Sequence, residues 1–229
     1  MEVILDNPDL VAKAFGYTAF LFLVSGFFSV IGGTLLAACR VGPISVLRTV
    51  GTAYVTIVRN TPLVMIFMFL QYGAGKVFDS LRFTWVSIHI GPFDFTSFFT
   101  AAVVALTLYT SAFVCEALRS GVNAVSMGQA EAARAIGLPF SGVLLHVVLP
   151  QAFRASVPPL ASTLIALLKN TSVAGSFGVI EAAAQMKAFT NDHADERWGI
   201  FLAFAIIYIV LVEVVSFASI RLERRWRIA

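Results

Sequence analysis

Charged and amide side chains lie inside three strongly apolar segments of the chain. They are Arg59 with Asn60, Glu116, and Lys169 with Asn170. Burial of an unpaired ionisable group in an apolar environment costs several kcal/mol, so such residues mark ligand sites, ion pathways or paired charges. The two cations can meet the carboxylates of a ligand. Alternatively, they pair with Glu116 or with helix ends and gate a pathway.

Other polar residues lie in the same segments. Tyr109, Thr110 and Ser111 can line a polar pathway, although core packing is an equal alternative for Tyr109. Glu116 and Arg119 are three residues apart, the spacing at which helical side chains meet. We therefore expect a local ion pair that braces the segment after Glu116.

Residue patterns for covalent chemistry are missing from the sequence. A phosphate-binding loop needs G-x4-G-K-[ST], and the nearest trace, Gly75-Lys76, has Leu70 and Val77 at the other required positions. No paired cysteines or clustered histidines predict a metal site, because the three histidines lie in separate segments, at His89, His146 and His193. We expect a non-catalytic chain without a cofactor or metal, and any ATP hydrolysis must come from another subunit.

Composition indicates which elements carry these residues. The 229 residues are 59% hydrophobic and only 13% charged, and the mean hydropathy is +0.87. Soluble domains carry about 25% charged and roughly 45–50% apolar residues. The chain is therefore predicted to be an all-α integral membrane protein, with the lipid bilayer as its environment and no nucleic-acid partner. A disordered chain is excluded because 21 phenylalanines supply too much apolar surface.

Five apolar segments are long enough to cross a bilayer, which takes about 20 residues. The predicted spans are residues 17–38, 50–72, 98–118, 156–177 and 199–220, preceded by an external segment 1–16 and followed by a basic tail 221–229. In the first span, Ser25, Ser29, Gly33 and Ala37 recur every four residues and predict close packing of another helix, within the chain or from a second subunit.

Charge distribution predicts the orientation. With the N-terminus outside, the outer segments 1–16, 73–97 and 178–198 hold five basic and nine acidic residues, whereas the rest of the chain holds 11 basic and four acidic residues. Basic residues concentrate on the cytoplasmic side of membrane proteins. The sequence therefore predicts an outer N-terminus and a cytoplasmic C-terminus.

Two local patterns refine the spans. Pro62 follows Arg59 closely and predicts a bend or break in the second span, where Thr61 can satisfy a freed carbonyl. The outer segment 178–198 predicts a short amphipathic helix at the membrane surface. That helix is either a cap on the bundle, which we favour, or a lid or seat for an external partner.

The cytoplasmic segment 119–155 has internal structure of its own. Ser126 and Gln129 have the spacing of a capping box, and a helix is expected to follow and to end at Gly137. A second amphipathic segment, Phe140 to Leu149, is expected to be closed by Pro150. This loop either fits the groove of a partner protein or lies on the inner leaflet, and the residue pattern alone leaves the two open.

The same segment resembles a known motif. Glu131-Ala132-Ala133-x3-Gly137-x9-Val147-x-Leu149-Pro150 is similar to the EAA loop, E-A-A-x3-G-x9-I-x-L-P, of ABC importer permeases, with Val147 in place of Ile. In this family the loop couples the permease to its ATPase. The resemblance implies coupling roles for Gln129, Glu131, Ala132, Ala133, Arg134, Gly137, Leu149 and Pro150.

Further stretches resemble the polar amino-acid permeases (the histidine, glutamine, arginine and glutamate group), and several details resemble glutamate-uptake permeases in particular. The similarity runs from about residue 17 to 220 and includes Arg59-Asn60-Thr61-Pro62-Leu63, Glu116-x2-Arg119-x-Gly121, Gly128-Gln129 and Lys169-Asn170-Thr171-Ser172. Relatives with basic or neutral substrates share these residue types, which favours gating over substrate selection for the charged ones. The pathway and gating candidates are Arg59, Asn60, Thr61, Pro62, Tyr109, Thr110, Glu116, Lys169, Asn170, Thr171 and Ser172.

The resemblance implies a type I (MetI-like) importer fold in a bacterial cell membrane. Its expected partners are ABC ATPase subunits that bind ATP and Mg²⁺, an extracytoplasmic amino-acid-binding protein, and a second permease subunit, with a heterodimer favoured over a homodimer. The implied substrate is a polar amino acid, with glutamate ahead of glutamine, arginine and histidine. An ion-coupled secondary carrier is the alternative class, but five spans do not divide into two equal repeats.

Overall fold

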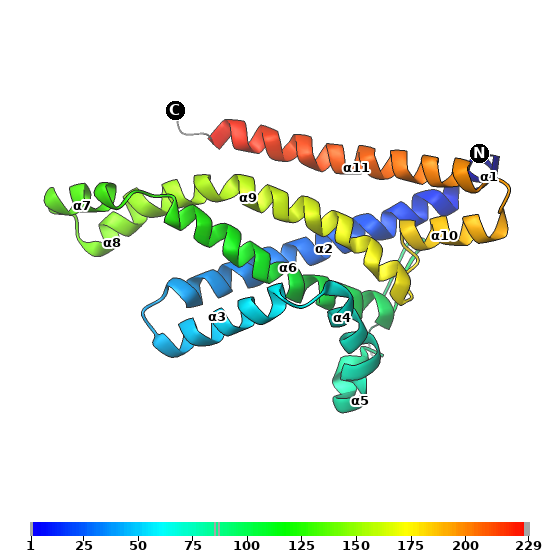
Figure 1. The fold of residues 1–229 in the computed structure, drawn as a ribbon, viewed down its shortest axis with the longest axis horizontal. Helices are drawn as coiled ribbons and strands as arrows, with labels where there is room; N and C mark the ends of the chain where they lie inside the picture. The colour runs from blue at the N-terminus through cyan, green and yellow to red at the C-terminus, as the bar shows by residue number, and fades with distance from the viewer. Residues whose placement is uncertain (1, 85, 87, 227–229) are drawn as a thin grey trace.

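The computed structural model describes residues 2–84, 86 and 88–226, so Arg227 and the final two positions of the predicted basic tail lie outside the described residues. Long helices form an elongated bundle with short elements at both ends (Figure 1). By length and composition, four helices in the described part can cross a membrane. They are α2 (Pro8–Val41), α6 (Ser97–Asn123), the continuous segment Phe140–Phe177, and α11 (Arg197–Trp226). The prediction of an all-α membrane protein is confirmed.

The second predicted span is broken. Its first part is α3 (Ser45–Arg59) and its second part is Leu63–Val77, and the two are bent by 104° relative to each other. The second part contains α4 (Leu63–Met68), the π-helical turn η1 (Phe69–Ala74) and α5 (Gly75–Val77). The 15 residues of α3 rise roughly 22 Å, less than a bilayer core. The expected bend or break at Pro62 is confirmed, and the predicted fifth span exists in the described residues if the bent pair is counted as one span.

Hydrogen bonds at the break explain how the chain tolerates it. Pro62 has no N–H, so it cannot bond to the carbonyl of Val58 one turn earlier. The Thr61 N–H donates to Val58 O at 3.2 Å, and the Thr61 hydroxyl donates to Ile57 O at 2.8 Å. Thr61 therefore satisfies the end of α3, as expected from the sequence.

Small residues allow the central helices to approach closely. Ser25, Ser29 and Gly33 of α2 are buried, and a Cβ added at Gly33 would overlap Val114 of α6. The small-residue pattern therefore serves packing within the chain. Two turns further along α6, Gly121 lies against Ala152 and Ser156 of α9 (Leu149–Asn170).

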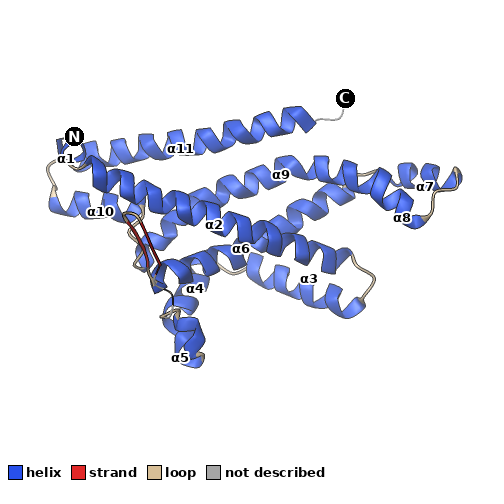
Figure 2. Ribbon diagram, turned by 180° about the vertical axis from the view of Figure 1, so that it is seen from behind, coloured by secondary structure: helices blue, strands red, loops and turns tan. Residues whose placement is uncertain are grey.

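At one end of the bundle lie the N-terminus, α10 and the start of α11 (Figure 1). A small antiparallel hairpin lies beside α10 (Figure 2), and the sequence did not predict it. Tyr17 of α2 holds the hairpin, since its hydroxyl accepts from Asp94 N at 2.8 Å and donates to Asp94 O at 3.2 Å. The elements at this end are α1 (Glu2–Asp6), β1 (Ile88–Ile90), β2 (Phe93–Phe95) and α10 (Ala182–Asp192), whereas η2 (Asp79–Arg82) packs against η1 and α5.

The opposite end carries α7 (Met127–Ala135), which lies between α6 and a long helical segment (Figure 1). That segment runs without a break through α8 (Phe140–Val143), η3 (Leu144–Val148), α9 and η4 (Thr171–Phe177). The loop is therefore shorter than the predicted 119–155. The expectation that Pro150 closes a separate helix is wrong, because it lies in the first turn of α9 and the preceding π-helical turn pairs Leu149 N with Leu144 O.

Candidate functional site

The end of α7 is a sharp reversal of the chain at Gly137. Its φ is +91°, in the left-handed region that favours glycine. The Gly137 N–H donates to Arg134 O at 2.9 Å, and the Leu138 N–H donates to Ala133 O at 3.1 Å. These two bonds form a complete Schellman motif. The predicted glycine cap is confirmed.

The predicted capping box at the other end of α7 is only half correct. Ser126 occupies the N-cap position, but its side chain makes no capping hydrogen bond. Gln129 does not reach back to Ser126; its side-chain oxygen instead accepts from Gln151 Nε2 of α9. Gln129 therefore ties α7 to the long helix.

Exposed residues of α7 and its flanks form what we call the α7 surface. Ala133 faces inward and is 6% exposed, whereas Met127 and Ile136 are 78% and 81% exposed. Glu131 and Arg134 are also exposed, and within the described residues neither has an ion-pair partner. A projecting surface of apolar and free charged groups is typical of a protein interface. The α7 surface consists of Met127, Glu131, Ala132, Arg134, Ile136 and Phe140.

Leu149 and Pro150 of the same motif lie apart from α7. Both belong to the first turn of α9, and Leu149 is 44% exposed. The motif therefore combines a short helix, a glycine turn and the start of a long helix. The structure thus links the α7 surface directly to the helix that crosses the bundle.

Glu116 is the centre of a charge cluster, which we call the Glu116 cluster. Its Oε2 lies 3.2 Å from Arg59 Nη1, and its Oε1 lies 3.2 Å from Arg119 Nη1. Arg40, near the end of α2, also pairs with Oε1. One carboxylate thus joins α2, α3 and α6. The expected Glu116–Arg119 pair is present. Of the two roles predicted for Arg59, ligand contact or pairing with Glu116, the structure shows the pairing.

The sequence did not single out Arg40 as a member of this cluster. Its position in the last turn of α2 was a usable signal, since a cation at a helix C-terminus near the membrane boundary is available to a neighbouring carboxylate. Its side chain is only 10% exposed, the most buried of the three arginines.

A groove between α6 and α9 brings several predicted pathway residues together. Tyr109, Thr110 and Asn170 line a cavity of about 410 Å³ with Phe113 of α6. The Arg59 guanidinium lies 5.7 Å from the centre of the Phe113 ring, so the Glu116 cluster adjoins the groove. Asn60, Thr61 and Pro62 lie at the nearby break after α3 instead.

Ser162 and Thr163 also line this groove, and neither was predicted from the sequence. Their hydroxyls donate to Pro158 O at 3.2 Å and to Pro159 O at 2.8 Å. These are ordinary bonds of a helical hydroxyl to the carbonyl four residues earlier. The available signal was a pair of adjacent hydroxyl residues within an apolar predicted span.

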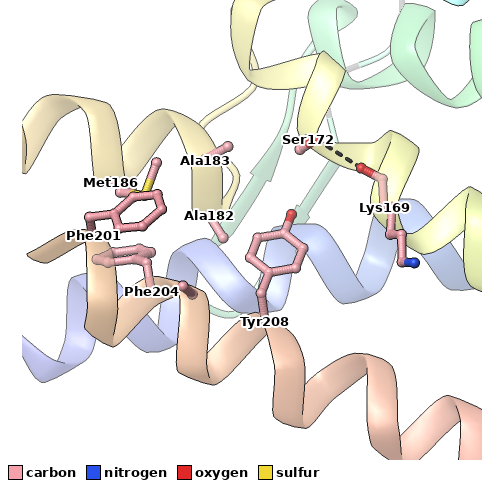
Figure 3. A pocket seen from close by; sticks show the side chains of 9 residues that line it. Lys169, Ser172, Ala182, Ala183, Met186, Phe201, Phe204 and Tyr208 are labelled. Carbon is pink, nitrogen blue, oxygen red and sulfur yellow. Dashed lines mark hydrogen bonds between the residues drawn. The ribbon is translucent and has the colours of Figure 1, made fainter.

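The sequence Lys169-Asn170-Thr171-Ser172 does not act as one unit. Asn170 faces the groove, whereas Thr171 is fully buried and donates to Leu168 O at 2.7 Å. Lys169 and Ser172 line a second cavity, of about 310 Å³, between α9, α10 and α11 (Figure 3). Among the described residues, no acid pairs with the exposed Lys169.

In the part of the chain that the structure describes, no group of three or more His, Cys, Asp or Glu side chains gathers. The arrangement instead offers a docking surface at one end, a largely apolar groove with several hydroxyl and amide groups along the bundle, and a charge cluster between them. Such an arrangement suits the movement of a polar molecule past a gate.

Residues 29–228 match the family model described as binding-protein-dependent transport system inner membrane component. The chain is 43% identical over 205 residues to the glutamate transport system permease protein GluC of Corynebacterium efficiens, covering 90% of this chain and 88% of that protein. It is 31% identical over 228 residues to the probable glutamine ABC transporter permease protein GlnM of Bacillus subtilis, covering 98% and 97%. The crystal structure of an amino acid ABC transporter with histidines matches with a TM-score of 0.83 at 25% identity, over 97% of each chain.

Proposed function

The chain belongs to the family of binding-protein-dependent transport system inner membrane components, and on this premise we propose that it is the permease subunit of an ATP-driven glutamate importer in a bacterial cell membrane. The preference for glutamate rests on the 43% identity to a protein named for glutamate transport. Glutamine is the second candidate substrate, because a relative at 31% identity is named for it.

The observation that carries the proposal is the α7 surface. An ATPase subunit needs a projecting, rigid element on which to act, and α7 is held by the Schellman motif at Gly137 and by Gln129 on α9. We assign the coupling role to Gln129, Glu131, Ala132, Ala133, Arg134 and Gly137 on this hairpin, and to Leu149 and Pro150 where it joins α9. Force on α7 then reaches the groove through one continuous helix.

The groove between α6 and α9 is the proposed path of the substrate. Its hydroxyl and amide groups can replace hydration of a polar amino acid. Arg59 is assigned to gating, because its charge is paired with Glu116. The end with α1, α10 and the hairpin is the outer face, where an extracytoplasmic binding protein delivers the amino acid.

The chain itself performs no covalent chemistry in this proposal. ATP and Mg²⁺ are bound by partner ATPase subunits, and a second permease completes the membrane pore, with a related but different chain favoured over a second copy. In this proposal the ATPase subunits act on the chain through α7 only.

Reconstitution into proteoliposomes tests the proposal. The assembled transporter, purified from native membrane with its associated chains, is loaded with ATP inside and supplied with the binding protein and labelled glutamate outside. We expect uptake that requires the ATPase subunit, together with ATP hydrolysis stimulated by glutamate and competed by unlabelled glutamate more than by glutamine. Uptake that persists without the ATPase and follows an ion gradient would instead identify a secondary carrier.

A further inference from the structure

A pocket that the proposed substrate path does not use lies at the end of the bundle that holds α1, α10 and the hairpin (Figure 2). We call it the outer pocket. Its volume is about 340 Å³, which is enough for a small ligand such as an amino acid. Its wall combines the first turns of α2, strand β2, the start of α6 and the start of α10. The polar residues of this wall are Lys13, Tyr17, Asp94, Thr96 and Gln185.

Lys13 is the cation of the outer pocket. The residue is half-buried, and in the part of the chain that the structure describes it forms no ion pair. Asp9 lies one helical turn earlier, at the spacing at which side chains can pair, but the structure forms no such pair. The ammonium group of Lys13 is therefore available to a carboxylate from outside the chain.

Asp94 is the anion of the outer pocket, and its backbone is fixed. The Tyr17 hydroxyl accepts from Asp94 N at 2.8 Å and donates to Asp94 O at 3.2 Å. Asp94 Oδ1 contacts His89 Nδ1, whereas Oδ2 makes no hydrogen bond to a described residue. A carboxylate held in this way, with one free oxygen, can accept a hydrogen bond from an ammonium group.

Gln185 supplies an amide group on a helix that is held in place by its cap. Glu181 is 0% exposed, and its Oε1 and Oε2 accept from Ala184 N at 2.9 Å and from Ala183 N at 3.0 Å. Gln185 lies one turn after Glu181, and its N–H donates to Glu181 O at 3.0 Å. The side-chain amide of Gln185 makes no hydrogen bond within the described residues. It can therefore donate to, or accept from, a polar ligand.

Charges of opposite sign thus line one pocket without neutralising each other. Lys13 and Asp94 both belong to its wall, but they form no ion pair. An inorganic anion would be repelled by Asp94 and a simple cation by Lys13, so neither is complementary to both. A zwitterion is complementary to both, because its carboxylate can contact the cation and its ammonium group can contact the carboxylate.

We propose that the outer pocket is an external binding site for a zwitterionic amino acid with a polar side chain, separate from the groove between α6 and α9. Lys13 holds the α-carboxylate, Asp94 holds the α-ammonium group, and Gln185 contacts the side chain. That this amino acid is the transported one rests on the proposed function. A lipid headgroup that joins a phosphate to an ammonium group carries the same two charges, so the experiment separates these two sources.

Protection of a cysteine against a maleimide measures occupancy of the outer pocket. Leu10→Cys places a thiol in its wall at a position that is 45% exposed. The assembled transporter, without binding protein or ATP, is reconstituted in phosphatidylcholine and phosphatidylglycerol and treated with a membrane-impermeant maleimide. We expect glutamate at millimolar concentration to slow labelling several-fold. The control is Leu5→Cys of α1, which is exposed outside this wall and should label equally with and without glutamate.

Ligand analogues test the two charges. Glutarate keeps both carboxylates of glutamate but has no ammonium group, and the amine left after decarboxylation of glutamine has no carboxylate. Each should require a roughly tenfold higher concentration than glutamate for equal protection, because one charged contact is lost. Equal protection by either analogue would overturn the assignment of a zwitterion. Phosphatidylethanolamine in the bilayer should leave protection by glutamate unchanged, and protection by this lipid in place of glutamate would overturn the assignment of an amino acid.

Variants test the residues. Lys13→Gln and Asp94→Asn each remove one charge and should raise the glutamate concentration for half-protection roughly tenfold. Lys187→Gln and Asp192→Asn remove exposed charges of α10 outside the pocket wall and should retain wild-type protection. Gln185→Glu repels the side-chain carboxylate of glutamate and should weaken protection by glutamate more than by glutamine. That variant gives a result even if Asp94→Asn loosens the hairpin.

The inference is overturned if glutamate does not protect Leu10→Cys, if Lys13→Gln and Asp94→Asn are protected like the wild-type pocket, or if only the binding protein slows labelling. The last result would make the pocket a docking surface for that protein. The protection assay needs neither ATP nor uptake. Protection without ATP-driven uptake would therefore reject the proposed function and leave the outer pocket intact, whereas ATP-driven uptake without protection would reject the outer pocket alone.

Discussion

Arg59 Nη1 lies 3.2 Å from Glu116 Oε2, so the last residue of α3 is tied to α6 directly before the chain breaks at Pro62. The same carboxylate also pairs with Arg40 and Arg119. Arg59 thus fixes the broken span relative to the groove between α6 and α9.

Arg59→Ala is expected to lower uptake about fivefold, because a partly exposed ion pair contributes about 1 kcal/mol to the population of the correct arrangement. Since Glu116 already neutralises Arg59, glutamate and glutamine should suffer alike. Competition assays of uptake in proteoliposomes measure this effect. A loss confined to acidic substrates would mean that Arg59 binds the substrate carboxylate directly.

Glu116→Gln is expected to destabilise the protein more than Arg59→Ala does. The variant leaves three guanidinium groups without their carboxylate, and the Arg40 side chain is only 10% exposed. We expect a loss of about 2 kcal/mol in the free energy of unfolding. Thermal unfolding in detergent measures it, with the exposed Glu131→Gln as the control. Equal unfolding temperatures for the two variants would contradict the structural role of the cluster.

Gly137→Leu is expected to uncouple ATP turnover from uptake or to prevent assembly. A side chain at φ +91° costs about 1–2 kcal/mol, and no neighbour lies within 4 Å of a Cβ at this position, so the strain is in the backbone. Gly128→Ala in the first turn of α7 is the matched control, because a Cβ there also meets nothing and φ is not positive. Substrate-stimulated ATPase activity and copurification of the ATPase report the outcome. Normal coupling in Gly137→Leu would argue against a need for this turn.

Local signals in the sequence predicted much of this fold. Gly137 ends α7 because its backbone alone tolerates the left-handed region, and Pro62 breaks a span because it lacks an N–H. The prediction that a helix ends at Pro150 was wrong, because proline is also accepted in the first turn of a helix. A π-helical turn before Pro150 keeps the segment continuous. The same residue type thus has opposite effects that depend on backbone geometry.

Tertiary contacts were harder to predict than helices. The hairpin had a signal, since Ile88, Ile90, Phe93 and Phe95 alternate around Gly91-Pro92, but the apolar composition concealed it. Glu181 had no such signal. Its burial results from Thr18, Gly175 and Tyr208, which converge from distant parts of the chain.

Gly121→Ala is expected to destabilise the contact between α6 and α9 by about 1–3 kcal/mol. A Cβ at this position would overlap the Ser156 hydroxyl and approach the carbonyl of Ala152, and backbone atoms cannot move aside cheaply. Gly26→Ala is the control, because its Cβ would make an ordinary contact of 3.5 Å with Leu167. A lower unfolding temperature for Gly121→Ala alone is the expected result. Equal effects would mean that α6 and α9 are not packed this closely.

Stability should also depend on pH through Glu181. Burial raises the pKa of its carboxyl from the ordinary value of 4.5, which applies in the unfolded chain, to about 7 in the folded protein, so the folded state holds the proton more tightly. This contribution is fully present below pH 4.5, declines as the pH rises through about 7, and is then lost. A shift of this size corresponds to roughly 3 kcal/mol, since each pKa unit is about 1.4 kcal/mol.

Thermal unfolding from pH 4.5 to pH 8.5 measures this dependence, with wild type compared with Glu181→Gln so that other titrating groups cancel. The wild-type curve should fall relative to the variant between pH 4.5 and 7.5, because only the wild type must bury a carboxylate or open around it. Gly175→Ala provides a second comparison, since it crowds the carboxyl group without changing its charge. It should lower stability at every pH and retain the wild-type slope. Parallel curves for wild type and Glu181→Gln would show that Glu181 ionises no differently in the folded and unfolded states.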